Sequence, residues 1–263
     1  KVAKRLEDMG VESIDYLMIT HFDRDHAGGA AQIIQDFDVK ALLRPEYMKE
    51  SDESAASMEA AEDRGVKVII ITSQTDIQLG STKLVIHPAD KVYENDASNN
   101  SSLVTEVFHG NNSLLFTGDI EKERIADIKY ELNDAGYDFL KVPHHGRYEK
   151  ILPEFFSLVG AQSAVITSSE KNPEEQETIQ ALEDAGVKNT RSLLLGWQKE
   201  GVGVYPQSVS PSGSAGGKTE KKACPNPYAG TWSMPFSAKA LVVDADHHRG
   251  GLDDRIGLLA NGQ

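Results

Sequence analysis

Short apolar segments alternate with helix-like segments at both ends of this chain, and a β-rich stretch lies between them. The first helix-like and strand-like segments cover residues 2–9, 14–20, 27–37, 39–45, 47–65 and 66–72. The β-rich stretch contains residues 83–87, 102–110 and 112–118. The alternation then returns, with helix-like segments at 120–136, 153–160 and 172–186 and strand-like segments at 137–143, 161–169 and 201–206. Because helices that alternate with strands pack outside a sheet, this order predicts a layered α/β fold. It leaves open whether the strands form one sheet or two.

The composition is that of a globular protein with an acidic surface. The chain has 263 residues, 39% of them hydrophobic, and a formal net charge of −14. That charge argues against broad electrostatic capture of nucleic acid, although a metal site could still meet a phosphate group locally. Cys224 is the single cysteine, which excludes an internal disulfide and a zinc site built from cysteines. No apolar run approaches the roughly 20 residues of a membrane span.

A change in composition after Pro206 divides the chain. We predict a folded domain over residues 1–206, a flexible linker rich in Ser and Gly over 207–223, and a tail of unknown structure over 224–263. The chain begins with Lys1, directly before a helix-like segment, so we expect a fragment or a processed product. The sequence leaves the oligomeric state and any targeting segment open.

The loop THFDRDHAGG, residues 20–29, directly follows an apolar strand-like segment. Alternate side chains of an extended segment point the same way, so His21, Asp23 and Asp25 would share one side. His26 stands next to Asp25 where a helix begins, and the glycines allow the backbone to pass close to a site. Two imidazoles and two carboxylates this close together can bind one or two divalent ions. We therefore predict a metal site at this loop.

Two other strand ends carry residues of the same kind. Asp119 ends the segment LLFTGD, residues 114–119, where it would either bind metal or cap the following helix. His144 and His145 follow the strand-like segment 137–143, where they would either complete a metal site or form a surface pair. Each of these residues alone has a simple structural explanation. Their combination with the first loop favours a shared metal centre.

Taken in order, the segments HxDxDHxGG, TGD and LKVPHHG resemble the metallo-β-lactamase superfamily, whose usual first motif is HxHxDH. Asp23 within the first motif, with NNSSLV before TGD, is most similar to the hydrolase domain of ComEC-type competence proteins and their soluble relatives. The resemblance covers roughly residues 1–206. It implies an α/β fold, a four-layer αββα sandwich with a dinuclear site between its sheets. The first N-terminal strands of that pattern lie before Lys1 or are absent, so we expect an open sheet edge.

The resemblance also implies the ligands of two divalent ions. The expected set is His21 and Asp23 for one ion and Asp25 and His26 for the other, with Asp119 as a bridge. His144 or His145 would complete the ligands of the second ion. The family usually has a further histidine where Asn99 and Asn100 stand, so the first ion would be held weakly or through water. Zn²⁺ and Mn²⁺ are the expected ions, with Mg²⁺ as a third option, because Asp23 makes the site richer in oxygen. Arg147 replaces a serine of the subgroup, and its guanidinium could contact a substrate phosphate.

These residues together predict a metal-dependent hydrolase. A metal-bound hydroxide would attack the substrate, with Asp25 and His26 as catalytic residues. The leading hypothesis is a phosphodiester substrate, and the ComEC resemblance implies single-stranded DNA. Two alternatives stay open: hydrolysis of another ester, such as a lactone, a thioester or a phosphorylcholine ester, and a non-catalytic metal-binding scaffold. The same resemblance slightly favours the bacterial envelope or the exterior of the cell as the location.

Overall fold

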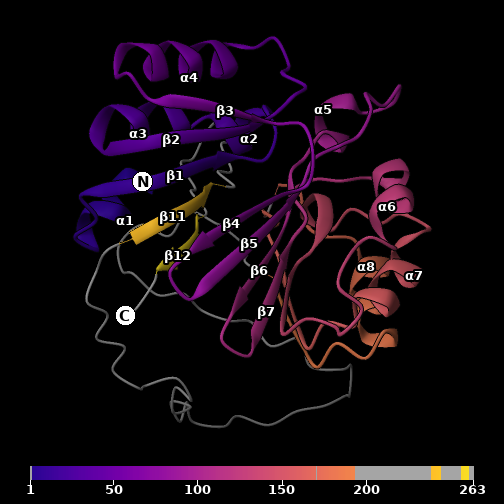
Figure 1. Cartoon of the computed structure of the whole chain (residues 1–263). Coiled ribbons are helices and arrows are strands. Elements are labelled where there is room, and N and C mark those ends of the chain that lie inside the picture. The colour runs from indigo at the N-terminus through magenta and orange to yellow at the C-terminus, as the bar shows by residue number, and fades with distance from the viewer. Residues whose placement is uncertain (1, 170, 193–237, 244–255, 261–263) are drawn as a thin grey trace, which may run out of the picture.

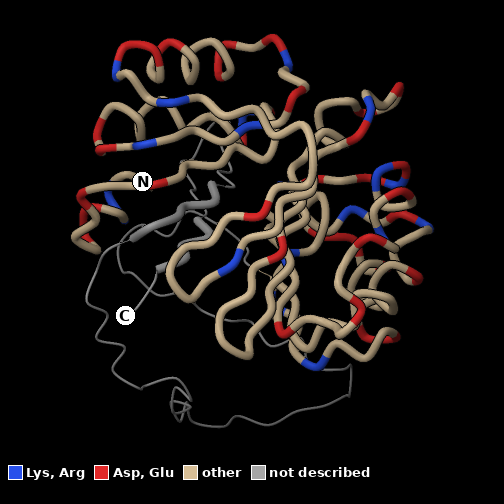
Figure 2. Tube along the Cα trace, in the orientation of Figure 1, with Lys and Arg blue, Asp and Glu red and all other residues tan. Residues whose placement is uncertain are grey.

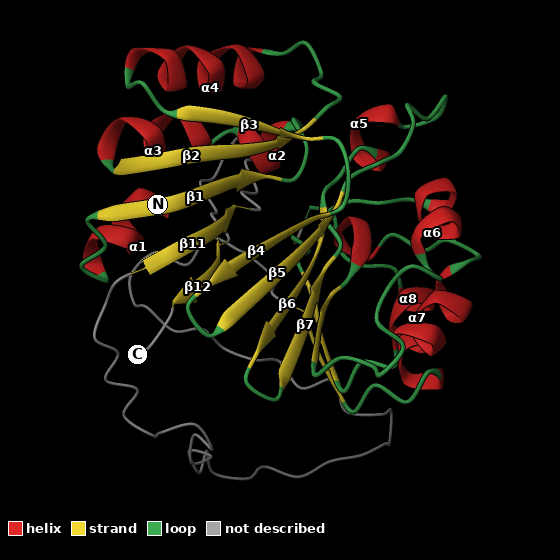
Figure 3. Ribbon diagram, in the orientation of Figure 1, coloured by secondary structure: helices red, strands yellow, loops and turns green. Residues whose placement is uncertain are grey.

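The computed structural model describes residues 2–169, 171–192, 238–243 and 256–260. Two β-sheets, one of five strands and one of seven, pack together, and helices cover their outer faces (Figures 1 and 3). The predicted αββα sandwich is confirmed. Among the residues that the structure describes, no helix has both the length and the apolar character needed to cross a membrane.

The five-stranded sheet and the helices outside it form one half of the sandwich. In chain order these elements are α1 (Val2–Asp8), β1 (Ser13–Ile19), α2 (Arg24–Ala27), α3 (Ala30–Asp36), β2 (Asp38–Pro45), α4 (Asp52–Asp63), β3 (Lys67–Ile71), β11 (Ala238–Val243) and β12 (Ile256–Ala260). The strand order is β12-β11-β1-β2-β3, and β1, β2 and β3 run parallel because helices return the chain between them. Acidic residues lie along α4 on the outside (Figure 2), in keeping with the negative net charge.

The seven-stranded sheet and its helices form the other half. In chain order the elements are β4 (Thr75–Leu79), β5 (Thr82–His87), α5 (Ala97–Asn100), β6 (Val104–His109), β7 (Asn112–Phe116), α6 (Lys122–Ile128), β8 (Phe139–Lys141), the 3₁₀ turn η1 (Pro143–Gly146), α7 (Leu152–Val159), β9 (Ser163–Ile166), α8 (Gln176–Asp184) and β10 (Asn189–Ser192). Strands β4 to β7 are antiparallel, whereas β7 to β10 are parallel. The strand order is β10-β9-β8-β7-β6-β5-β4.

The second half of strand β1 is apolar because both of its faces are buried there. Leu17 and Ile19 pack into the cluster beneath the outer helices, and Met18 between them packs into the cluster between the two sheets. Leu43 of β2 and Ile86 of β5 join Met18 in that inner cluster. Adjacent side chains of a strand point to opposite faces, so a continuous apolar run is what a strand buried on both sides requires.

Two sequence expectations about the fold were wrong. The helix expected over 120–136 ends at Ile128, because the backbone near Asn133 turns to donate hydrogen bonds of 3.2 Å to Glu106 and 3.0 Å to the Tyr137 hydroxyl. The edge of β1 that we expected to be open is paired in parallel with β11. The expected strand at 201–206 and the linker at 207–223 lie outside the described residues, so the domain boundary at residue 206 stays a prediction.

The two sheets bring one end of several strands together. The loop after β1, the segment after β7 and the turn after β8 all leave their sheets at the carboxyl ends of parallel strands. Strand β9, parallel to β8, ends beside them. The carboxyl ends of parallel strands are where open α/β sheets place their ligand sites. This edge carries all three segments that the sequence pointed to.

A buried polar network on β6 lies within the seven-stranded sheet. The carboxylate of Glu106, which is 4% exposed, lies 2.8 Å from Nε2 of His87 and accepts hydrogen bonds from the Tyr137 hydroxyl and the Asn133 backbone. Burial opposes ionisation of Glu106, but the hydrogen bonds from His87 and Tyr137 lower its pKa below the usual 4.5. The charged carboxylate therefore contributes to stability.

Glu106→Gln is expected to lower the free energy of unfolding by about 1–3 kcal/mol at pH 7, because buried donors lose a charged acceptor. A carboxylate with a depressed pKa stabilises the fold above pH 4.5, and the contribution is lost as the pH falls through the folded-state pKa. The difference in the free energy of unfolding between the wild type and Glu106→Gln should therefore become smaller below pH 4.5. Urea unfolding at pH 7 and pH 4 measures it, with exposed Glu183→Gln as the control. An equal difference at both pH values would show that the charge of Glu106 is unimportant.

Candidate metal centre

The loop after β1 presents two of the expected side chains from one short helix. Thr20 and His21 end the extended segment, Asp23 precedes α2, and Asp25 and His26 lie within its single turn. His26 is 1% exposed, whereas Asp25 lies at the surface of the group. Because Asp25 and His26 are neighbours on this turn, both reach the edge where the two sheets meet.

A positive-φ glycine places Asp119 at the centre of the site. Gly118 follows β7 with a φ of 55°, and a Cβ at this position would lie 2.7 Å from Cβ of Ser102. The backbone can therefore pass close to Ser102, whose hydroxyl accepts a hydrogen bond of 3.1 Å from the Asp119 backbone N–H. The Asp119 carboxylate is fixed from its own backbone and is 2% exposed.

The turn after β8 holds the two histidines in an unusual backbone conformation. His144 and His145 have φ values of 42° and 54°, and Gly146 follows with 80°. Left-handed conformations cost energy for residues other than glycine, and they concentrate at functional sites. This turn directs the two imidazoles apart, with 6.1 Å between their ring centroids.

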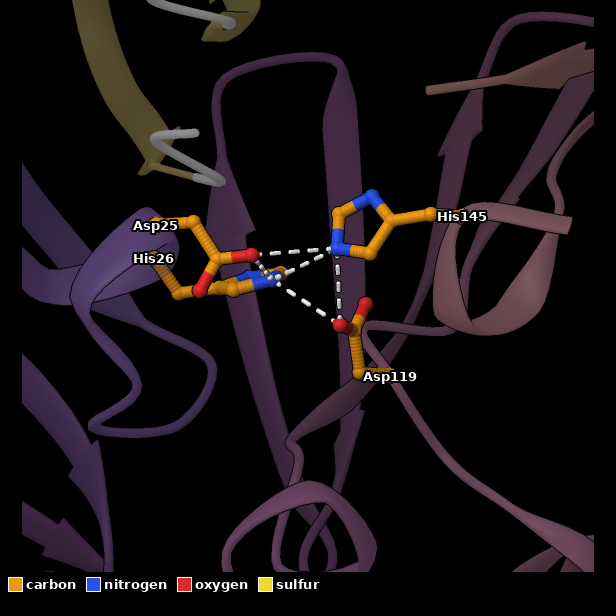
Figure 4. A group of neighbouring side chains, drawn as sticks. All are labelled: Asp25, His26, Asp119 and His145. Atoms are coloured by element: carbon orange, nitrogen blue, oxygen red, sulfur yellow. Dashed lines mark hydrogen bonds and ion pairs between the residues drawn. The ribbon is translucent and has the colours of Figure 1, made fainter. Parts of the chain in front are cut away.

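Four side chains converge at this edge of the sheets: Asp25, His26, Asp119 and His145 (Figure 4). Each offers one ligand atom, and the four atoms all lie within 4.8 Å of one another. Oδ2 of Asp119 lies 3.1 Å from Nε2 of His26 and 2.9 Å from Nε2 of His145. Oδ2 of Asp25 lies 3.2 Å from Nε2 of His145. Two imidazole nitrogens and two carboxylate oxygens therefore face a common point.

The carboxylates and imidazoles of the group shift one another's pKa values. Burial opposes ionisation of Asp119, but His145, His26 and Lys141 hold its pKa well below the usual range. Burial likewise opposes ionisation of Asp25, yet the hydrogen bond from His145 and the charge of His26 lower its pKa. Burial opposes protonation of His145, but Asp119 and Asp25 raise its pKa to about 10. Two ionised carboxylates thus meet in a largely buried space that attracts positive charge.

Groups behind the imidazoles fix which nitrogen faces the centre. Nδ1 of His145 donates a hydrogen bond of 2.6 Å to the backbone oxygen of Thr167, which follows β9. Nδ1 of His26 lies 3.3 Å from the Thr20 hydroxyl. Metal-binding histidines commonly donate their outer N–H in this way, and Nε2 then has a lone pair for an ion once its own proton is released. The structure therefore presents the Nε2 atoms as ligands.

The other expected ligands of the first loop lie outside this group. Asp23 accepts a hydrogen bond of 2.9 Å from Nζ of Lys49 and another from the Ser98 hydroxyl. Burial alone would raise the pKa of Asp23, but these two hydrogen bonds lower it. The His21 ring is buried against His26, with 3.9 Å between ring centroids, and its Nδ1 lies 3.1 Å from the Ser102 hydroxyl.

His144 belongs to a neighbouring network around Glu121. Nδ1 of His144 lies 2.8 Å from Oε1 of Glu121, and the Asn99 amide donates a hydrogen bond of 2.9 Å to the same oxygen. Burial opposes ionisation of Glu121, but His144 and its other hydrogen-bond partners lower the pKa to about 2. Oδ1 of Asn100 accepts a hydrogen bond of 2.8 Å from the Glu121 backbone. The geometry thus brings His145, rather than His144, to the convergent group.

A cavity of about 500 Å³ adjoins the group on the side of Asp25 and His145. Residues 167–169 and 171–173 form one wall, and the backbone N–H of Glu175 ties this wall to Gly146 through a hydrogen bond of 3.0 Å. Arg147 also lines the cavity, whereas Asn99 and Asn100 are not among its lining residues. A substrate in this cavity would contact Asp25 and His145 directly, whereas the buried His26 and Asp119 do not line it.

Several residues of the site were missed by the sequence reasoning. They are Thr20, Lys49, Ser98, Ser102, Glu121, Lys141 and Thr167. Lys141 was the most visible signal, since a lysine inside the apolar strand segment of LKVPHHG calls for a buried counter-ion. Nζ of Lys141 lies 3.0 Å from Oδ1 of Asp119, and both side chains are buried. Lys49 and Thr167 are distant in sequence from the motifs, and no local signal marks them.

The group fits a divalent ion chemically. Two imidazoles with two carboxylates form a mixed nitrogen and oxygen set of the kind that Zn²⁺ and Mn²⁺ accept in proteins. The carboxylates are ionised, and the outer nitrogens of both imidazoles are directed to Thr20 and Thr167. Among the residues that the structure describes, this is the group of histidines and carboxylates whose ligand atoms converge. It is a candidate metal site.

Comparison with known families gives a match over the same part of the chain. The family profile described as the metallo-beta-lactamase superfamily matches residues 2–166. This range contains the first loop, Asp119 and the turn with His145, so the matched region includes the four converging side chains. The resemblance stated from the motifs is confirmed.

Two relatives match at the level of sequence. ComE operon protein 3 of Bacillus subtilis (strain 168) is 28% identical over 187 residues, a match that covers 70% of this chain and 24% of that protein. Recombination protein 2 of Haemophilus influenzae is 28% identical over 160 residues, covering 61% of this chain and 18% of that protein. The chain therefore spans about a quarter or less of the length of these relatives.

A comparison with solved structures gives a match of low sequence identity. Igni18, described as a novel metallo hydrolase from the hyperthermophilic archaeon Ignicoccus hospitalis, is 17% identical with a TM-score of 0.46. The similarity covers 70% of this chain and 77% of that one.

Proposed function

The chain belongs to the metallo-β-lactamase superfamily, and from this premise we propose that it is a metal-dependent hydrolase of phosphodiester bonds, with single-stranded DNA as its substrate. The observation that carries the proposal is the convergence of Asp25, His26, Asp119 and His145 beside a cavity. A phosphodiester is anionic, and this cavity is also lined by Arg147 and Lys171. The second relative is named for recombination, and the motifs resemble ComEC-type competence proteins, which supports DNA as the substrate.

The residues of the group have distinct parts in the proposed reaction. Asp25, His26, Asp119 and His145 would hold Zn²⁺ or Mn²⁺, with Mg²⁺ as a third option. Such an ion lowers the pKa of a water molecule and offsets negative charge on a phosphoryl oxygen. Asp25, which lines the cavity together with His145, would orient the attacking water and accept its proton. The peptide groups and hydroxyls behind the imidazoles keep both Nε2 atoms directed inward.

An assay can distinguish the proposed function from two other functions. A hydrolase of lactones, thioesters or phosphorylcholine esters would use the same ligands, and a metal-binding scaffold would use them without turnover. The purified chain with Mn²⁺ should therefore be assayed on a labelled single-stranded DNA oligomer, a phosphorylcholine ester, a lactone and a thioester. Cleavage of the oligomer at a rate well above the others supports the proposal. Turnover of another ester alone, or of none, contradicts it.

We expect Arg147 and Lys171 to bind phosphate groups of the substrate. Both residues line the cavity beside His145, and a cation that contacts a phosphate of a single strand contributes about 0.7 to the slope of log affinity against log salt. Arg147→Ala and Lys171→Ala should each raise KM and change kcat little. Each should also make the dependence of log affinity on log salt less steep by about 0.7.

Lys188→Ala is the matched control for these two substitutions. Lys188 is exposed and precedes β10, at the opposite end of the parallel strands from the metal centre. Its loss should leave KM and the salt dependence unchanged. Equal effects of all three substitutions would indicate general electrostatics rather than phosphate contacts in the cavity.

The same resemblance supports a proposal for the cellular location. We infer that the chain acts in the bacterial envelope or outside the cell, where ComEC-type proteins would meet incoming DNA. Fractionation of cells that produce the native protein tests this location, and recovery in the cytoplasm alone contradicts it.

A further inference from the structure

We propose that the metal centre holds one divalent ion rather than two, and that the ammonium groups of Lys141 and Lys49 occupy ligands that a second ion would need. The inference rests on the proposed metal-dependent function and concerns the number of ions, which the family resemblance alone would set at two. It follows from the partners of Asp119 and Asp23, two expected ligands of the other ion, and from the partners of the two asparagines that stand where the family usually has a histidine.

The carboxylate of Asp119 is divided between two kinds of partner. Its Oδ2 faces Nε2 of His26 and His145 at 3.1 and 2.9 Å, whereas its Oδ1 lies 3.0 Å from Nζ of Lys141. Nζ of Lys141 also donates a hydrogen bond of 2.8 Å to the backbone oxygen of Gly118. The side chain of Asp119 is 3% exposed and that of Lys141 is 5% exposed. Removing the counter-ion of a lysine buried in this way is strongly unfavourable. Asp119 therefore offers one oxygen to a metal and does not bridge two ions.

The carboxylate of Asp23 is directed to a different cation. Nζ of Lys49 lies 2.9 Å from its Oδ1, and the Ser98 hydroxyl donates to the same oxygen. The side chains of Asp23 and Lys49 are 28% and 47% exposed, so this pair is weaker than that of Lys141 and Asp119. Its position still matters, because Asp23 is the residue that differs from the usual histidine of the family motif.

The two asparagines that stand where the family usually has a further histidine form hydrogen bonds with other residues. The Asn99 amide donates to Glu121, and Asn100, which is 1% exposed, binds the Glu121 backbone and the Asn95 carbonyl oxygen. A second ion would thus have to displace two lysines and break these hydrogen bonds. A positive charge of Lys141 beside Asp119 also repels a further cation at that side of the centre.

Counting the ions tests the inference without any activity measurement. The full chain is loaded with excess Mn²⁺, freed of unbound metal by gel filtration, and analysed by inductively coupled plasma mass spectrometry and electron paramagnetic resonance. We expect one Mn²⁺ per chain with no spin coupling between ions. Asp25→Asn should bring the count close to zero, whereas Asp23→Asn should leave it at one.

Other metal counts would contradict either the inference or the proposed function. Two ions per chain, coupled in the spectrum and reduced to one by Asp23→Asn, would overturn the inference while leaving the proposed function in place. A folded wild type that binds no ion would overturn the proposed function itself. The double variant Lys49→Met/Lys141→Met should take up a second ion. If its count stays at one, the lysines do not exclude that ion, and their assigned role is wrong.

Discussion

Asp119→Asn is expected to abolish hydrolysis and to lower the free energy of unfolding by about 3 kcal/mol, the typical result of leaving a buried charge unpaired. The substitution removes an oxygen that faces both His26 and His145, so metal affinity should fall as well. It also removes the counter-ion of Lys141, whose side chain is buried. Metal content, cleavage rate and urea unfolding of the purified variant measure the three effects.

A second substitution separates the structural effect from the chemical one. Lys141→Met in the Asp119→Asn background removes the stranded ammonium group, and replacing both partners of a buried ion pair is often close to neutral. The double variant should regain most of the lost stability and none of the activity. If stability stays low, the loss does not come from Lys141. If activity returns, Asp119 is not a metal ligand.

Gly118→Ala is expected to damage the centre through the backbone. A Cβ at this position would lie 2.7 Å from Cβ of Ser102, and overpacking of this kind costs about 1–3 kcal/mol. The displaced Ser102 hydroxyl holds the Asp119 backbone and lies against His21. We therefore expect lower stability together with at least tenfold lower kcat, about 1.4 kcal/mol in the barrier.

Gly110→Ala is the matched control for this change. Gly110 lies in the turn between β6 and β7 with a φ of 58°, close to the 55° of Gly118, but no atom lies within 4 Å of a Cβ added there. Both alanines thus carry the same backbone strain, and only Gly118→Ala carries the collision. Thermal unfolding and kcat should both be lower for Gly118→Ala than for Gly110→Ala. Equal values for the two variants would show that contact with Ser102 is unimportant.

The layered fold was predictable because its signal is local. Apolar runs such as residues 14–20 and helix-like spacing over residues 2–9 mark the elements. The segment HGNNS, residues 109–113, is typical of a hairpin turn, and it joins β6 to β7. The end of α6 at Ile128 was not predictable, since it depends on hydrogen bonds with Glu106 and Tyr137. The pairing of β11 with β1 joins segments far apart in the chain, which no local pattern can reveal.

The candidate site was predictable as a set of residues but not as a geometry. Motif spacing marked the segments that carry Asp25, His26 and Asp119. The choice between His144 and His145 depends on two consecutive left-handed residues, which the spacing does not encode. The hydrogen bonds of Asp23 with Lys49 and Ser98 depend on two separate loops. Whether each expected ligand reaches an ion therefore stays a prediction for the metal measurements.

The central claim is that the group around Asp25 cleaves a phosphodiester with the help of a divalent ion. The most direct test is cleavage of an end-labelled single-stranded DNA oligomer with Mn²⁺, comparing the wild type, Asp25→Asn and the exposed control Asp184→Asn. We predict cleavage that requires Mn²⁺, falls by about a thousandfold or more in Asp25→Asn, as losses of residues central to a reaction do, and is unchanged in Asp184→Asn. Absence of cleavage by folded, metal-loaded wild type, or equal cleavage by Asp25→Asn, would contradict the claim.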